Sequence, residues 1–272
     1  MDYRVLALDL DGTLTNSKKI ITEKTKTAVE KAIEKGVSIV LASGRPVLGI
    51  RKLADELGLS ELGGYILAYN GGHIIDCKTK KDIVRQTVPK EYFHEICECA
   101  RIFGVSALTY DTHGVVTECA DASYVIKEAY NNTIPIRQVE SLESFVDYDV
   151  TKFMIVGEAN ELKAALKYLQ DKFEKKLSVF LSEPYFMEIG PLGVEKASAL
   201  AKLLEHLETD REHLMACGDG LNDIPMLKYA GFAVAMENAY PETKAVADFI
   251  TFSNEEDGVA YAINRFILGL EE

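Results

Sequence analysis

Short apolar runs alternate with helix-like segments at both ends of the sequence, and this alternation constrains the fold more than any other feature. Residues 4–10 are almost continuously apolar, as expected for a strand that is buried on both faces of a sheet. Thr22 is placed to cap a helix that continues through Lys35 and stops at Gly36. Residues 37–45, VSIVLASGR, predict a second buried strand. Because parallel strands need a crossover segment between them, this order indicates a parallel sheet.

The same rhythm continues to a third strand and then returns near the end of the chain. Pro46 suits the first turn of a helix, Gly58 its end, and residues 65–72, YILAYNGG, a strand followed by a turn. After residue 190 the sequence predicts helices at 194–207, 222–230, 239–247 and 258–268, and strands at 213–217, 231–236 and 248–252.

The middle of the chain has a different pattern. Residues 72–88 predict a hairpin. Beyond it we expect helices at 92–103 and 160–176, and strands near Ala107 and Val115 and at 152–157, 178–182 and 185–189. Such strands pair antiparallel, and helices on one face would complete an α+β domain. We therefore predict an α/β protein: a Rossmann-like parallel-sheet core domain of residues 1–82 and 190–272, with an α+β domain of residues 83–189 inserted in it.

Composition excludes several classes of function. The formal charge is −13 over 272 residues, and the chain shows no Lys/Arg cluster of the kind that nucleic acid or an anionic membrane selects, which argues against both as partners. The five cysteines form no metal-like group, so we expect free thiols in a reducing compartment. The residues before Asp9 do not have the pattern expected of a signal peptide, and no run approaches the roughly 18 apolar residues of a membrane span. We expect a cytoplasmic protein.

Polar clusters follow four of the predicted core strands. They are Asp9 to Asp11, Ser43 to Arg45, Asn70 to Gly72, and GDGLND at residues 218–223. Ligands of open parallel sheets bind beyond the carboxyl ends of the strands. Four clusters at equivalent strand ends therefore predict one binding site.

The pair Asp9 and Asp11 has two interpretations. Asp11 and Gly12 could form only a tight turn, because Asp-Gly between apolar residues is a strong hairpin signal. Alternatively, residues i and i+2 of an extended strand point to the same side, so the two carboxylates would lie side by side and need a shared cation.

Two more acids strengthen the second interpretation. Asp9, Asp11, Asp219 and Asp223 together would bring a charge of about −4, which a divalent cation and Lys196 would largely offset. Oxygen ligands favour Mg²⁺, which commonly completes its coordination with a substrate phosphate. We therefore expect these four carboxylates to bind Mg²⁺, and a small phosphorylated molecule to be the substrate. A carboxylate beside such a group can attack phosphorus and form an aspartyl-phosphate.

Four motifs in this order resemble the haloacid dehalogenase superfamily, and more narrowly its class IIB, the Cof-type phosphatases. They are DLDGT at residues 9–13, SGR at 43–45, the lone Lys196 on a helix, and GDGLND at 218–223. The resemblance covers essentially the whole chain. It implies that Asp9 is the nucleophile and Asp11 the general acid/base.

The resemblance also implies roles for further residues. Ser43, with the backbone of Gly44, would bind the transferred phosphoryl group, and Asn222 matches a phosphate-contacting position. Lys196 matches the catalytic lysine of the family, and Asp219 would hold Mg²⁺ with support from Asp223.

Several other positions rest on weaker signals. The backbone amides of Leu10 and Gly12 can face the phosphoryl oxygens, as in an oxyanion hole. Arg45 could bind substrate or pair with a local carboxylate, and Asn70 could be only a turn residue. Many relatives have Lys-Gly where this chain has Lys196 followed by Ala197. This departure from the family pattern affects only the expected geometry of the helix start.

The leading hypothesis is a Mg²⁺-dependent phosphatase of small phosphorylated metabolites, such as sugar phosphates or phosphorylated cofactors. By the resemblance, the inserted domain is a cap that closes over the site and selects the leaving group. A phosphomutase of the same fold and a non-catalytic phosphate-binding module are the alternatives. A binding module has no need of an acid/base, so Asp11 argues against it. The sequence specifies neither the substrate nor the oligomeric state.

Overall fold

The computed structural model describes residues 2–270 and divides into two compact units. The core unit comprises the chain up to Val84 and again from Glu195, and the cap unit runs from Arg85 to Val194. The predicted boundaries differ from these by a few residues. The difference at the second boundary arises because the last strand of the cap continues to Pro191.

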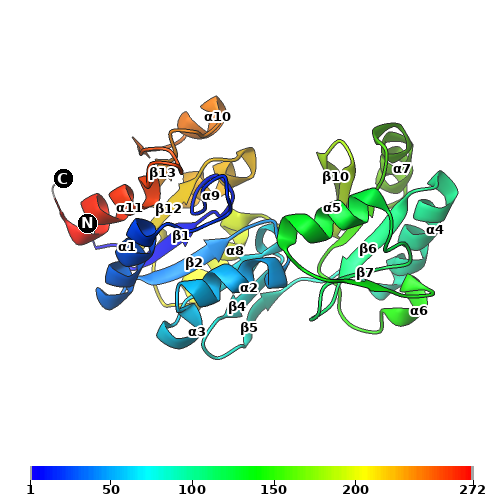
Figure 1. Ribbon diagram of the computed structural model, residues 1–272, viewed down its shortest axis with the longest axis horizontal. Helices are drawn as coiled ribbons and strands as arrows, with labels where there is room; N and C mark the ends of the chain where they lie inside the picture. The colour runs from blue at the N-terminus through cyan, green and yellow to red at the C-terminus, as the bar shows by residue number, and fades with distance from the viewer. Residues whose placement is uncertain (1, 271–272) are drawn as a thin grey trace. The chain divides into compact units, whose positions relative to one another are not determined.

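The core unit is built on an eight-stranded sheet (Figure 1). In spatial order its strands are β14 (Phe249–Ile250), β13 (Phe232–Ala235), β12 (Leu214–Gly218), β1 (Val5–Leu8), β2 (Ser38–Ala42), β3 (Tyr65–Ala68), β4 (His73–Asp76) and β5 (Asp82–Arg85). From β14 to β3 neighbouring strands are parallel, and β4 pairs antiparallel with β3. The predicted Rossmann-like sheet is confirmed, and the predicted hairpin forms its β4–β5 edge.

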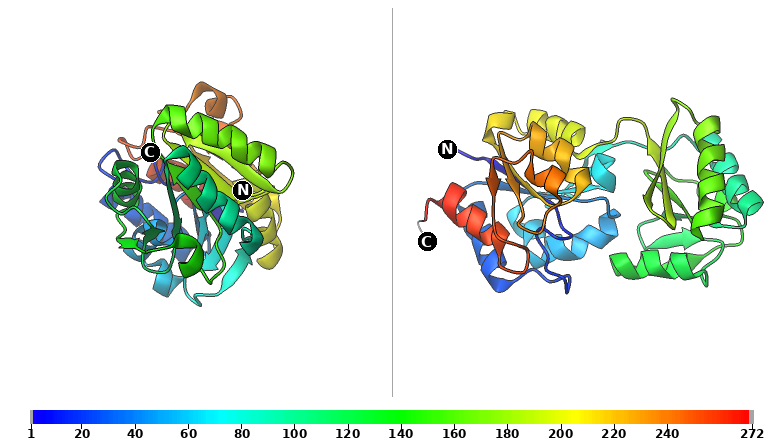
Figure 2. Two further views of the ribbon diagram at one scale, coloured as in Figure 1. Left: turned by 90° about the vertical axis from the view of Figure 1, so that its right-hand side faces the viewer. Right: turned by 90° about the horizontal axis from the view of Figure 1, so that it is seen from above.

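Helices cover both faces of the core sheet (Figure 2). The helical segments are α1 (Glu23–Glu34), α2 (Val47–Glu56), α3 (Leu59–Leu62), α8 (Lys196–His206), η3 (Arg211–His213), η4 (Leu221–Asp223), α9 (Ile224–Tyr229), α10 (Pro241–Lys244), α11 (Gly258–Ala262) and the π-helical η5 (Ile263–Leu268). The short segment η1 (Tyr69–Gly71) is a turn whose residues have positive φ. Side chains of α1, α2 and α11 pack on one face, and those of α8 and α9 on the other. All four residues of β1 are buried, which explains its continuous apolar sequence.

The cap unit contains a six-stranded sheet in the order β10, β11, β9, β6, β7, β8. Its elements are η2 (Lys90–Tyr92), α4 (Phe93–Phe103), β6 (Ser106–Tyr110), β7 (Val115–Thr117), α5 (Ser123–Asn132), β8 (Ile136–Gln138), α6 (Leu142–Phe145), β9 (Phe153–Val156), α7 (Ala159–Lys172), β10 (Leu177–Glu183) and β11 (Phe186–Pro191). Neighbouring strands of this sheet pair antiparallel, except that β7 and β8 are parallel. This is the expected α+β architecture.

The cap differs from the prediction in where its helices lie. Helices α4 and α7 pack on the sheet face that carries Phe153 and Ile155, as expected for helices on one face. Helix α5 lies against the opposite face, where its Glu128 accepts a hydrogen bond from the Tyr110 hydroxyl (2.6 Å) beside Met154. The sequence did not predict α5, because its buried residues include polar Glu128 and Asn132, which weaken the apolar periodicity.

Candidate active site

The predicted polar clusters lie together at the carboxyl edge of the core sheet. Strand β1 lies between β12 and β2, with Leu8 opposite Cys217 on one side and Leu41 on the other. Asp9, Ser43 and Asp219 come directly after these three strands. The parallel register therefore brings residues that are far apart in sequence to one edge, as predicted.

The chain turns sharply after Asp9. The amide of Leu14 donates to the carbonyl of Asp9 (3.2 Å), and the amide of Thr15 donates to the carbonyl of Leu10 (2.9 Å). Gly12 has a φ of 84°, and a side chain there would overlap the carboxylate of Asp219. The Asp-Gly sequence is thus a tight turn, and it also brings the backbone against an acid of the site.

Lys196 lies at the centre of the site, between Asp9 and Asp223. It is the first residue of α8 and is 1% exposed. Its Nζ donates to Asp9 Oδ1 (2.6 Å), to Asp223 Oδ1 (2.6 Å) and to the carbonyl of Ala42 (2.8 Å). These three contacts use all three protons of the ammonium. A charged group can be buried at this depth only when it has such partners. The alanine that follows Lys196 does not prevent the helix from starting here.

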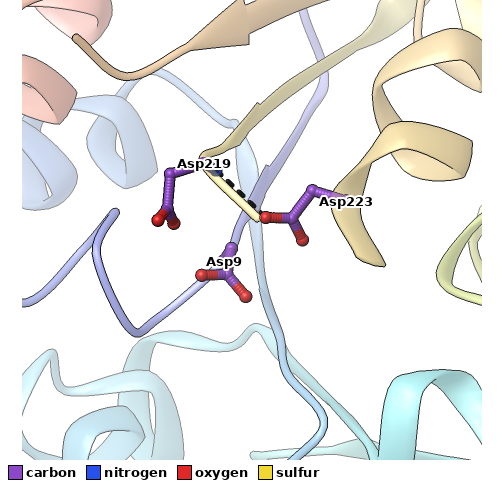
Figure 3. Close-up of side chains that lie close together, drawn as sticks. All are labelled: Asp9, Asp219 and Asp223. Carbon is purple, nitrogen blue, oxygen red and sulfur yellow. Dashed lines mark hydrogen bonds between the residues drawn. The ribbon is translucent and has the colours of Figure 1, made fainter. Parts of the chain in front are cut away.

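Asp223 joins this centre to the loop after β12. Its Oδ2 accepts hydrogen bonds from the backbone amides of Asp219 (3.0 Å) and Gly220 (2.9 Å). Figure 3 shows the side chains of Asp9, which follows β1, and of Asp219 and Asp223, both from the loop after β12, pointing toward one another. One oxygen from each of these carboxylates lies within 4.8 Å of the others.

The pKa values reflect this crowding. Burial and then the neighbouring Asp223 raise the pKa of Asp9 well above its ordinary value, against the lowering effect of Lys196. Burial raises the pKa of Asp219 to about 6, although the hydroxyl of Thr13 donates to it (2.8 Å). Burial lowers the pKa of Lys196, but Asp9 and Asp223 raise it by more, so the ammonium stays charged.

A divalent cation fits the residues that are present. Three carboxylates face one another, and the single ammonium offsets only part of their charge. Asp9 and Asp219 could contribute oxygen ligands, with Asp223 in support because its oxygens already accept three hydrogen bonds. A cation would lower the raised pKa values of Asp9 and Asp219, because an opposite charge favours the ionised form.

The structure corrects the expected placement of Asp11. Its carboxylate does not lie in the three-carboxylate group but accepts two hydrogen bonds from Arg45, at 2.7 Å from Nε and 2.6 Å from Nη2. Lys19 pairs with the same carboxylate. The strand ends at Leu8, so the rule that places i and i+2 on one side of an extended strand does not apply beyond it.

Arg45 therefore contacts an acid of the site. Burial raises the pKa of Asp11, but the hydrogen bonds and charge of Arg45, together with those of Lys19, lower it below its ordinary value. Asp11 thus differs from Asp9, whose pKa is raised. Two acids of the same turn are held in opposite electrostatic environments.

The remaining predicted residues surround the same edge. Ser43 is buried, and its hydroxyl accepts a hydrogen bond from the amide of Arg45 (3.2 Å). Gly44 lies beside Asn70, and Asn222 donates through its side-chain amide to Asn70 Oδ1 (3.3 Å). The side chain of Leu10 is fully buried, so only its backbone can act at the site.

Comparison with known proteins identifies the family. The family model for haloacid dehalogenase-like hydrolases matches residues 6–263. The chain belongs to this family of hydrolases. The assignment made from the motifs, class IIB of the haloacid dehalogenase superfamily, is confirmed, and the protein is a phosphatase of that superfamily.

Relatives of this hydrolase match it over nearly the whole chain. It is 31% identical to the 5-amino-6-(5-phospho-D-ribitylamino)uracil phosphatase YcsE of Bacillus subtilis, over 98% of this chain and 97% of that one. A haloacid dehalogenase-like hydrolase from Bacteroides thetaiotaomicron is 45% identical, with a TM-score of 0.94 over 97% and 99% of the two chains. A subclass IIB sugar phosphatase is 26% identical, with a TM-score of 0.80 over 97% and 99%.

Three residues of the hydrolase's site were missed by sequence reasoning. Thr13 donates to Asp219, Lys19 pairs with Asp11, and the side-chain amide of Asn238 donates to the carbonyl of Gly12 (2.8 Å). Thr13 belongs to the DGT sequence and could have been found there. Lys19 and Asn238 carry no sequence signal, because only the folded loops bring them to the site.

Two further expectations concern the hydrolase as a whole. Among residues 2–270, no helix is both long enough and apolar enough to span a membrane. All five cysteines are free, and all but Cys119 are buried. Burial raises the pKa of Cys217 to about 12, so this thiol stays protonated and unreactive inside β12.

Proposed function

We propose that this enzyme is a Mg²⁺-dependent phosphatase that hydrolyses small phosphorylated metabolites through an aspartyl-phosphate on Asp9. The observation that carries the proposal is the buried contact between Lys196 Nζ and Asp9 Oδ1 (2.6 Å), beside two further carboxylates. Mg²⁺ would be held by Asp9 and Asp219, with Asp223 in support. When bound, it would screen the negative nucleophile from the negative phosphate.

Asp9 is suited to be the nucleophile because Lys196 fixes one oxygen of its carboxylate. In the first step an Asp9 oxygen forms a bond to phosphorus while the bond from phosphorus to the leaving oxygen breaks, and the leaving oxygen takes a proton from Asp11. In the second step water attacks the phosphorus of the aspartyl-phosphate and gives a proton to Asp11. The bond from Asp9 to phosphorus breaks, inorganic phosphate leaves, and the carboxylate is restored.

Asp11 must exchange protons in both steps. Its lowered pKa keeps the carboxylate ionised, which is the form that accepts a proton from water in the second step. For the first step it must carry a proton. A phosphate dianion nearby raises its pKa, because a second negative charge disfavours ionisation. Arg45 holds this carboxylate through two hydrogen bonds and so sets its orientation.

The phosphoryl oxygens would be bound by donors on the same edge. Ser43, the backbone of Gly44 and the side-chain amide of Asn222 are the donors that the resemblance assigns. The backbone amides of Leu10 and Gly12, in the turn after β1, would complete the set. Such donors, held in place by the fold, stabilise charge that develops in the transition state.

Two relatives support a small phosphorylated substrate. One is a sugar phosphatase, and the other acts on 5-amino-6-(5-phospho-D-ribitylamino)uracil. The net charge of −13 also disfavours a large polyanion such as nucleic acid. We therefore place the substrate among sugar phosphates and phosphorylated cofactors or their precursors.

The test is a phosphate-release assay over a panel of such metabolites, with millimolar Mg²⁺ or with excess EDTA. We expect inorganic phosphate from part of the panel, loss of release in EDTA, and no release by Asp9→Asn. Isomerised sugar phosphate without free phosphate would indicate a mutase instead. Binding of phosphate without turnover on any member would favour the non-catalytic module, and full turnover in EDTA would exclude the metal.

A further inference from the structure

The turn after β3 has an unusual backbone. Tyr69, Asn70 and Gly71 are three consecutive residues with positive φ, at 54°, 55° and 108°. Residues other than glycine rarely adopt this left-handed region, and a bulky residue such as Tyr69 does so at a cost in free energy. Strain of this kind persists where the surrounding structure holds it, and such places are concentrated at functional sites.

On one side, the turn contacts the loop after β2, which contains the SGR sequence (the SGR loop). The amide of Tyr69 donates to the carbonyl of Arg45 (3.0 Å), and the amide of Asn70 donates to the carbonyl of Ser43 (2.9 Å). A Cβ on Gly44 would lie 3.1 Å from Asn70 Nδ2, so the side-chain amide of Asn70 packs directly against this backbone. The turn and the SGR loop thus form one unit.

On its other side the turn contacts the start of α8. A Cβ on Gly71 would lie 2.7 Å from the carbonyl oxygen of Glu195 and 2.7 Å from the Cβ of Ala199. No other residue type fits without moving the helix that begins with Lys196. The left-handed turn is therefore held between the SGR loop and the catalytic lysine's helix.

The side chain of Asn70 adds a third contact. Its Oδ1 accepts a hydrogen bond from Nδ2 of Asn222 (3.3 Å), a residue 152 positions later in the chain. Asn222 is exposed, so without this acceptor its amide would be free to rotate in solvent. An asparagine suits this position because it tolerates the left-handed backbone and also carries an acceptor and a donor.

We propose that Asn70 is a positioning residue for the phosphoryl group, which acts by orienting the side-chain amide of Asn222 toward the SGR loop. This inference rests on the proposed function, in which Asn222, Ser43 and Gly44 bind that group. A residue that served only the turn would need no side chain, because glycine adopts this backbone without strain. The amide bridge between the two loops is what a turn alone does not require.

The test begins with Asn70→Gly, which removes the amide and keeps a backbone that glycine tolerates. We expect KM for a phosphorylated substrate and the inhibition constant of inorganic phosphate each to rise about tenfold, which corresponds to about 1.4 kcal/mol. We expect kcat to change by less than about threefold and the melting temperature not to fall, because glycine relieves strain. Glu208→Gly is the control. Glu208 is a solvent-exposed residue of the core unit, it has a φ of 51°, and it lies away from the site.

The decisive measurement is a double-mutant cycle with Asn222→Ala. If Asn70 acts through Asn222, Asn70→Gly should add little to the phosphate inhibition constant once Asn222 is alanine. Additive effects of the two substitutions, or an Asn70→Gly enzyme with wild-type KM and phosphate inhibition, would overturn the proposal. Failure of the proposed function is distinguishable, because the wild-type enzyme would then release no phosphate at all.

Discussion

The crowding of carboxylates around Lys196 makes a prediction about stability. Asp219 is ionised at pH 8, yet in the folded protein without metal its pKa is raised to about 6 from 3.8. The folded state therefore holds a proton on Asp219 more tightly than the unfolded chain does. The ionised carboxylate destabilises the fold, and this penalty is absent below about pH 4, grows between about pH 4 and 6, and is complete above that.

The size of the penalty follows from the shift. About two pKa units correspond to about 3 kcal/mol at 1.36 kcal/mol per unit. Asp219 is only partly buried, so solvent screening reduces this to about 1 to 2 kcal/mol. Asp219→Asn removes the charge and keeps an oxygen that can accept the hydrogen bond of Thr13. For a protein of this size we expect its melting temperature in EDTA at pH 8 to rise by about 2 to 8 °C.

Adding Mg²⁺ should reverse the order of the two melting temperatures, so that wild type becomes more stable than Asp219→Asn. Binding to the folded state stabilises it by about 2.7 kcal/mol when Mg²⁺ is at a hundredfold excess over Kd. We expect wild type to gain this stability, and Asp219→Asn to gain much less because it lacks a ligand. The assay is a thermal melt of both proteins at pH 8 and at pH 4, with EDTA or with millimolar Mg²⁺.

The control for this experiment is Glu30→Gln, which removes one negative charge from an exposed position on α1. It should change neither the melt in EDTA nor the response to Mg²⁺. The reasoning would be refuted if Mg²⁺ left the wild-type melting temperature unchanged and Asp219→Asn were less stable than wild type in EDTA. The carboxylates would then be satisfied by the protein's own donors.

Three further predictions concern the residues of the turn after β1. Asp9→Asn should give no aspartyl-phosphate, measured by acid-quench trapping of labelled phosphate on the protein; a labelled variant would move the nucleophile elsewhere. Asp11→Asn should bind substrate and metal but turn over about 10² to 10⁴ times more slowly in steady-state assays, and near-normal turnover would contradict its acid/base role. Gly12→Ala should weaken Mg²⁺ binding and lower the melting temperature, because the added methyl group overlaps the Asp219 carboxylate and the φ of 84° disfavours alanine; titration calorimetry with unchanged Mg²⁺ affinity would count against it.

Much of the architecture was determined by the sequence alone. Apolar strands that alternate with capped helices can bury both faces only in a parallel sheet, and β1, α1 and β2 formed as predicted. The carboxyl ends of parallel strands share one edge, so the motifs after β1, β2 and β12 had to lie together. Because of that regularity, the strand pattern alone suffices to predict that Asp9, Ser43 and Asp219 are neighbours.

Only the tertiary structure decided which side chains meet at that edge. The side chain of Asp11 pairs with Arg45 rather than joining the carboxylates around Asp9. The strand ends at Leu8, and the turn that follows determines where the next side chains point. Asn70, an ordinary turn residue by sequence, meets Asn222 because the loops after β3 and β12 approach each other across the site. Strand periodicity extends only as far as the strand. Beyond it, side-chain direction depends on turn geometry and on packing between segments distant in sequence, and neither is encoded in a local pattern.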